Sequence, residues 1–98
     1  MLYTQPDDVD GFLAYYRDTH IPIAQTLPGI QQTSVSRITG TPRGTEAPYF
    51  LKAELTFASS EDLTAALSGD QGMNVSRDAM GMTQQFGCSA EILLAETL

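Results

Sequence analysis

Residues 12–29 read FLAYYRDTHIPIAQTLPG, and they hold the most informative pattern in the chain. Phe12, Tyr16 and His20 recur at every fourth position, which places them on one face of a helix, one turn apart. Pro22 has no backbone N–H, so we expect it to bend or restart the helix just beyond the histidine. His20 is the only histidine, and histidine is the residue type that exchanges protons most readily near neutral pH. The stretch predicts an amphipathic helix that carries a candidate site for chemistry.

Periodicity and turn residues predict further elements on both sides of this helix. An aspartate after Pro6 can cap its start, and Leu27-Pro28-Gly29 ends it. Ser59, followed by two acidic residues, is typical of a second helix start. The expected elements are a strand end at 1–4, a helix over about 9–27, strands at 33–39 and 49–57 joined by a loop at 40–44, helical pieces from 59 and over 69–82, and a strand at 86–94.

The order strand, helix, strand, strand, helix, strand predicts an α+β fold of the ferredoxin-like βαββαβ type over residues 1–98. Such a domain has a four-stranded antiparallel sheet with both helices on one face. In the clearest strand the expected helix-facing side carries Tyr49, Leu51, Ala53, Leu55 and Phe57. The opposite side carries Phe50, Lys52 and Glu54, a mixed surface that we expect a second copy to cover in a homodimer.

Composition excludes several classes of function. Twelve acidic and five basic residues give a net charge of −7, and the basic residues never cluster, which argues against nucleic-acid binding. The apolar runs are too short to cross a membrane, and the first residues do not resemble a signal peptide. The one cysteine, Cys88, lies in an alternating apolar pattern and is interpreted as a buried structural thiol. A cytoplasmic location is therefore expected.

The pattern Phe12-x3-Tyr16-x3-His20-x-Pro22, followed by Leu27-Pro28-Gly29, resembles the opening signature of the EthD family, named for ethyl tert-butyl ether degradation. Leu55-x-Phe57-x-Ser59 before an acidic helix start is similar to the second half of the family. Asp78 falls near an aspartate that the family has after its second helix. The resemblance implies a ferredoxin-like domain that dimerises as an α+β barrel.

Six side chains are candidates for a site, in two groups. His20, Tyr16 and Tyr49 are the candidate catalytic residues, with His20 as the proton-transfer group and the two phenols holding oxygens. Candidate ligand-binding residues are Phe12, Arg37 and Asp78. Each has a structural alternative: a core histidine, aromatics at the core edge, an ion-paired arginine and a helix-capping aspartate. No set of ligands has metal-binding spacing, and haem ligation by His20 has no second signal, so no cofactor is expected.

The leading hypothesis is a protein that acts on a small oxygenated organic molecule in a catabolic pathway. Relatives implied by the resemblance include isomerases and monooxygenases that use no cofactor. The first alternative is a non-catalytic ligand-binding or accessory dimer of a degradation operon, in which His20 only orients a ligand. The second is a structural dimer without a ligand. Nothing in the sequence names the substrate.

Overall fold

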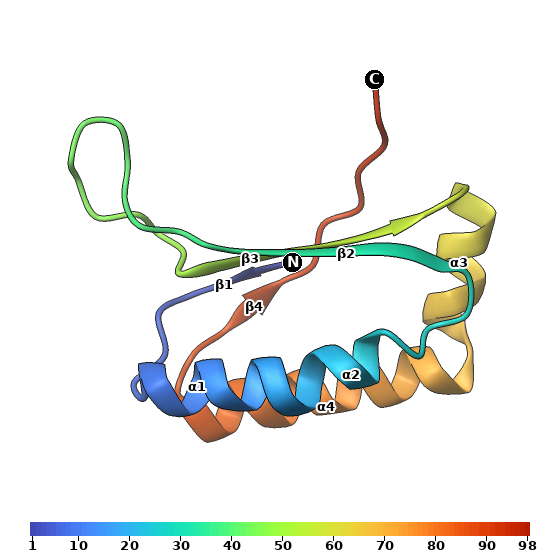
Figure 1. Ribbon diagram of the computed structural model, residues 1–98, viewed down its shortest axis with the longest axis horizontal. Coiled ribbons are helices and arrows are strands. Elements are labelled where there is room, and N and C mark those ends of the chain that lie inside the picture. Colours follow the sequence, from blue (N-terminus) through green and yellow to red (C-terminus); the bar gives the residue numbers. More distant parts are fainter.

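In the computed structural model, which describes residues 1–98, one sheet lies on one layer of helices (Figure 1). The strands are β1 (Leu2–Tyr3), β2 (Ile30–Arg37), β3 (Leu51–Phe57) and β4 (Ala90–Glu91). They form one sheet in the order β2-β3-β1-β4, and every neighbouring pair is antiparallel. This arrangement confirms the α+β fold class expected from the sequence.

The helices cover a single face of the sheet. The first helical stretch comprises α1 (Val9–Tyr15), a π-helical segment η1 (Tyr16–His20) and α2 (Ile21–Ala24), and it runs alongside α4 (Asp70–Phe86). The shorter α3 (Ser60–Ser68) lies at one end of the sheet and joins β3 to α4 (Figure 1). Both expected caps are present: the side chain of Asp8 accepts from the Gly11 N–H, and that of Ser59 accepts from the Asp62 N–H.

Pro22 accounts for the π-helical segment. A proline in an α-helix leaves the carbonyl four residues before it without a donor and clashes with it. Here the helix widens just before the proline, and the N–H of Ile21 bonds to the Tyr16 carbonyl five residues back. The helix therefore continues through Pro22 as α2, which ends at Ala24. Single π-helical turns of this kind are rare and recur at functional sites.

An aromatic cluster forms the main core between the helices and the sheet. Phe12 is fully buried, and its ring lies 5.6 to 6.1 Å, between centroids, from those of Tyr3, Tyr16, Phe50 and Phe86. A smaller cluster of Ala24, Leu27 and Val75 fills the space at the other end of α4. The first cluster lies directly beside His20, since the ring of Tyr16 is 5.2 Å from the imidazole. The candidate histidine is therefore held by packed aromatic rings.

The predicted final strand over residues 86–94 is wrong in most of its length. Val75, Ala79, Met82 and Phe86 recur at helical spacing and are all buried, so α4 continues to Phe86. Gly87 then ends the helix in the left-handed conformation, with φ 70°, which favours glycine. Only Ala90 and Glu91 pair with β1, and residues 92–98 are exposed.

The predicted alternation in the second hairpin strand also fails at its first two residues. Tyr49, expected on the helix-facing side, directs its hydroxyl to the exposed Glu91. Phe50 was expected on the sheet face that is open to solvent, yet it is 3% exposed and packs in the aromatic cluster. The backbone bends at Phe50, before β3 begins at Leu51, so that both residues turn inward. From Leu51 onward the prediction is correct, because Lys52 and Glu54 are exposed and Leu51 and Ala53 are buried. The other hairpin strand, β2, begins three residues earlier than expected.

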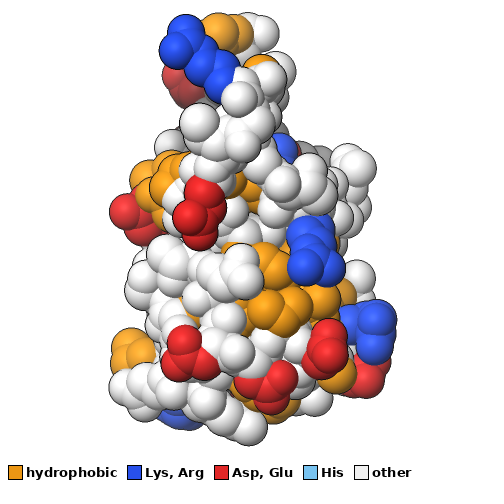
Figure 2. All heavy atoms as spheres, turned by 90° about the vertical axis from the view of Figure 1, so that its left-hand side faces the viewer, with side chains coloured by type: hydrophobic (Ala, Val, Ile, Leu, Met, Phe, Trp, Pro, Cys, Tyr) orange, Lys and Arg blue, Asp and Glu red, His pale blue; other side chains and the backbone are white.

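The surface is acidic but has no concentrated acidic patch on the face where α1 begins. Figure 2 shows acidic side chains scattered over this face among neutral ones. None of the helices combines the length and the apolar character that crossing a membrane requires.

Candidate functional site

Two helices bring His20, Asp78 and Tyr15 together through their side chains. His20 Nδ1 lies 2.7 Å from Oδ2 of Asp78, and the Tyr15 hydroxyl donates a 2.5 Å hydrogen bond to Oδ1 of the same carboxylate. His20 is 2% exposed, and the Asp78 side chain is 16% exposed. Hydrogen bonds to a carboxylate in such a screened position are short and strong, as these are. Because the three groups come from η1, α4 and α1, the site depends on the packing of both helices.

The widened turn explains why Tyr15 and His20 reach the same carboxylate. In an α-helix, side chains five residues apart diverge, but hydrogen bonds in a π-helical turn join residues five apart. The segment Tyr16–His20 has this geometry, so Tyr15 and His20 lie about one turn apart. The π-helical turn therefore gives Asp78 two donors on one helix.

The hydrogen bonds determine which atom of the imidazole is free. A carboxylate only accepts hydrogen bonds, so the proton between Asp78 and His20 belongs to Nδ1. The other nitrogen, Nε2, bonds to no protein group and is not a fully enclosed atom. In the neutral ring Nε2 then carries the lone pair, because the partner of one ring nitrogen sets the tautomer. Asp78 thus orients His20 as a proton acceptor at Nε2.

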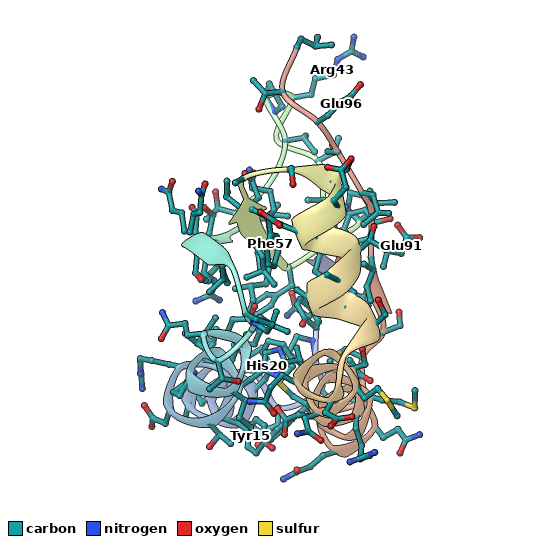
Figure 3. The ribbon with its side chains drawn as sticks, turned by 90° about the vertical axis from the view of Figure 1, so that its right-hand side faces the viewer. Tyr15, His20, Arg43, Phe57, Glu91 and Glu96 are labelled. Carbon is teal, nitrogen blue, oxygen red and sulfur yellow. The ribbon has the colours of Figure 1, made fainter.

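The three side chains run from the interior to the outer side of the helix layer. Figure 3 shows His20 between the two helices, close to the sheet, and Tyr15 on the side that points away from the sheet. Tyr15 and Asp78 line an open groove of about 600 Å³ on this outer side, between the first helical stretch and α4. His20 does not line this groove and lies behind the carboxylate.

The aromatic candidates on the first helix lie in the core. Phe12 and Tyr16 share the buried face of the helix with His20, as their spacing predicts, and their rings are stacked 5.7 Å apart. Burial raises the pKa of Tyr16 to about 12. Burial likewise raises the pKa of Tyr3, whose ring lies 5.5 Å from that of Tyr16. Tyr16 supports the imidazole from one side.

The structure does not bring Tyr49 or Arg37 to His20. The Tyr49 hydroxyl donates to Glu91 of β4 at 2.6 Å, which raises its pKa, and the residue lines a different hollow, made mainly by residues 38–49. The Arg37 guanidinium lies 5.0 Å from the centre of the Phe50 ring.

Sequence reasoning placed Asp78 near a helix end and overlooked Tyr15. Asp78 instead lies in the middle of α4 and turns toward η1, because α4 is longer than predicted. The Asp78 hydrogen bond raises the pKa of Tyr15, with burial as a smaller cause. No signal in the sequence distinguishes Tyr15 from its neighbour Tyr16, since the widened turn becomes visible only in the structure.

Other reactive groups lie apart from this site. No cluster of three histidine, cysteine or acidic side chains is arranged to hold a metal ion. Cys88 is half-buried at the edge of the aromatic cluster, so the expected buried thiol is only partly enclosed. Burial, and to a smaller extent the nearby Asp7, raises the pKa of this thiol.

Comparison with known proteins identifies the family. The model of the EthD domain matches residues 5–85. A crystal structure of an EthD family protein from Bacillus halodurans C-125 is 31% identical, covers 93% of both chains and superposes with a TM-score of 0.79. No curated protein matches the sequence. The expectation drawn from Phe12, Tyr16, His20 and Pro22 is thus confirmed, and the chain belongs to the EthD family.

Proposed function

We propose that this protein catalyses proton transfer on a small oxygenated organic molecule of a catabolic pathway, with His20 as the proton-transfer group. The observation that carries the proposal is the 2.7 Å bond between His20 Nδ1 and Asp78, which leaves Nε2 without a protein partner. A base must be oriented toward the proton that it takes, and a carboxylate behind the ring provides this orientation.

The proposed step abstracts a proton from a carbon beside a carbonyl group. Nε2 of the neutral His20 takes the proton, and the electron pair of the C–H bond moves toward the carbonyl oxygen. The imidazolium that forms remains bonded to the Asp78 carboxylate, which stabilises its positive charge. Return of the proton to a different atom would complete an isomerisation. His20 both takes and returns the proton, so this step consumes no further reactant.

Deuterium exchange tests this proposal without knowledge of the natural substrate. We expect the protein in D₂O to exchange the α-protons of at least one compound in a panel of small lactones and ketones. The loss of the α-proton signals in ¹H NMR spectra measures this exchange. His20→Gln should lower the exchange rate by about 100-fold, the usual contribution of a positioned base. The matched control is Asp18→Asn on the same π-helical segment, an exposed residue paired only with Arg17.

Two outcomes would contradict the proposal. Exchange that is equal in the wild type and a folded His20→Gln variant, with folding checked by circular dichroism, would exclude His20 as the base. Compounds that bind without any exchange in the wild type would favour the alternative of a non-catalytic carrier.

We also propose that two copies pair through the open face of the sheet. Lys52 and Glu54 lie on this face and bond to each other at 2.8 Å, while Phe50, expected there, is in the core. After β4 the chain passes the open face (Figure 1), and its apolar side chains are more than half exposed. These side chains are Ile92, Leu93, Leu94 and Leu98. A second copy of the chain would remove them from water.

Light scattering coupled to gel filtration measures this assembly. At micromolar concentration we expect the mass of a dimer for the wild type and of a monomer for the double variant Leu93→Glu and Leu94→Glu. Met80→Glu is the control, because Met80 is equally exposed but lies on α4. A monomeric wild type, or a double variant that remains dimeric, would contradict pairing through this face.

A further inference from the structure

The groove beside Tyr15 and Asp78 has a polar lining that the proposed proton transfer does not use. We propose that it binds a small organic acid, with the carboxylate on Arg77 and the remaining part of the molecule directed toward Tyr15. This inference goes beyond the proposed function, because the base of that function, His20, does not line the groove. Its evidence is independent: an unpaired cation, an ordered polar wall and a glycine that leaves space.

Arg77 is a cation without a carboxylate partner in a strongly acidic protein. Arg17 pairs with Asp18 at 3.3 Å, and Lys52 pairs with Glu54 at 2.8 Å. The guanidinium of Arg77 instead donates one long hydrogen bond, 3.4 Å, to the side-chain oxygen of Asn74, and it lines the groove. A guanidinium with unused donors matches the two oxygens of a carboxylate. Arg37 and Arg43 also have no carboxylate partner, but Arg77 is the basic residue that lines the groove.

A chain of hydrogen bonds orders the wall on which Arg77 lies. Asn74 donates to the Gln71 side-chain oxygen at 2.9 Å, and Gln71 donates across the groove to the Thr26 hydroxyl at 2.7 Å. Thr26 in turn donates to the carbonyl of Ile23 at 2.6 Å. These bonds tie the end of the first helical stretch to α4 and limit the movement of the amides. A wall that is ordered before binding loses less freedom when a ligand arrives.

Gly81 leaves the floor of the groove open. A glycine inside a helix costs stability relative to alanine, so it usually has a packing reason. Gly72 of the same helix has one, since a Cβ there would lie 2.4 Å from the carbonyl oxygens of Ala66 and Leu67. A Cβ on Gly81 would meet nothing within 4 Å. Because Gly81 lies one turn beyond Asp78 and lines the groove, the missing side chain leaves room for a ligand beside the carboxylate.

Titration with benzoate and its neutral analogue benzamide, followed by ¹⁵N–¹H NMR, tests the proposal. We expect benzoate to shift the amides around Arg77 and Gly81 and to bind about tenfold tighter than benzamide, the usual preference given by one charged hydrogen-bonded contact. Arg77→Gln should abolish this preference, whereas Arg17→Gln, the same change outside the groove, should keep it. Gly81→Leu should weaken both compounds by filling the space, with Gln84→Leu of the same helix as its control.

The outcomes separate this inference from the proposed function. Benzoate shifts that map to residues 38–49, or a preference that survives Arg77→Gln, would overturn the groove as an acid-binding site. Acid binding in the groove without deuterium exchange on any compound would support this inference and contradict the proposed proton transfer. Deuterium exchange on neutral ketones, with no preference of the groove for benzoate over benzamide, would support the proposed proton transfer and contradict this inference.

Discussion

The protein is expected to lose stability as the pH rises above about 10, because the buried Tyr16 and Tyr3 are neutral in the folded chain and burial raises the pKa of both. The pKa of Tyr16 is raised from 10.0 to about 12, so the folded state holds a proton that the unfolded chain releases earlier. The stabilisation is complete below pH 10 and is lost as the pH passes the folded pKa. Raising the pKa of Tyr16 from 10.0 to about 12 corresponds to roughly 2–3 kcal/mol of folding free energy, a large share of the stability of a small domain.

Denaturant unfolding followed by circular dichroism at pH 8, 10, 11 and 12 measures this loss. Tyr16→Phe keeps the ring in its stack with Phe12 and removes the ionising hydroxyl, so the variant should lose less stability between pH 10 and pH 12. Tyr49→Phe is the matched control, because Tyr49 bonds to Glu91 on the surface and should change the profile little. A Tyr16→Phe profile identical to that of the wild type would show that alkaline unfolding has another cause.

The pattern that the sequence carries most clearly is also the one that the structure retains. The fourfold spacing of Phe12, Tyr16 and His20 predicts a buried helix face, and all three side chains are buried. Side chains four residues apart lie near one another in both an α-helical and a π-helical turn. The buried helix face is therefore kept although the segment before Pro22 is π-helical. Helix caps are similarly local, and those at Asp8 and Ser59 formed as predicted.

The predictions that failed required information from distant parts of the chain. Residues 86–94 alternate as a strand would, but Phe86 also continues the helical spacing of Ala79 and Met82, and burial of that stripe prevails. Phe50 turns inward because the ring of Phe12 lies there to pack against it, 6.0 Å away between centroids. The alternation of apolar and polar residues along a short segment cannot indicate either of these contacts, because both partners lie elsewhere in the chain.

The candidate site was predictable in its central residue but not in its geometry. His20 and Asp78 are 58 positions apart, and no spacing rule joins two helices over such a distance. Tyr15 enters through the widened turn, which only the packed structure reveals. The groove on the outer side of the helices, lined by Tyr15 and Asp78, has no signal in the sequence either.

Asp78→Leu is expected to lower proton transfer by His20 about 100-fold, because the change removes the group that orients the base. Leucine has a similar size but accepts no hydrogen bond, so Nδ1 of the buried His20 loses its only partner. An unsatisfied buried donor costs about 1–3 kcal/mol of stability. Asp18→Leu, an exposed change on the neighbouring π-helical segment, should have neither effect.

Nitrogen chemical shifts of the imidazole distinguish orientation from general destabilisation. In the wild type, ¹⁵N NMR should show the proton of the neutral ring on Nδ1 and the lone pair on Nε2, since Asp78 accepts from Nδ1. In Asp78→Leu both tautomers should appear, because nothing favours either nitrogen. If this variant does not fold, Asp78→Asn offers a single acceptor oxygen for two donors and should show a partial shift. A ring that keeps its proton on Nδ1 in both variants, with unchanged exchange rates, would remove Asp78 from the site and leave His20 oriented by the aromatic core alone.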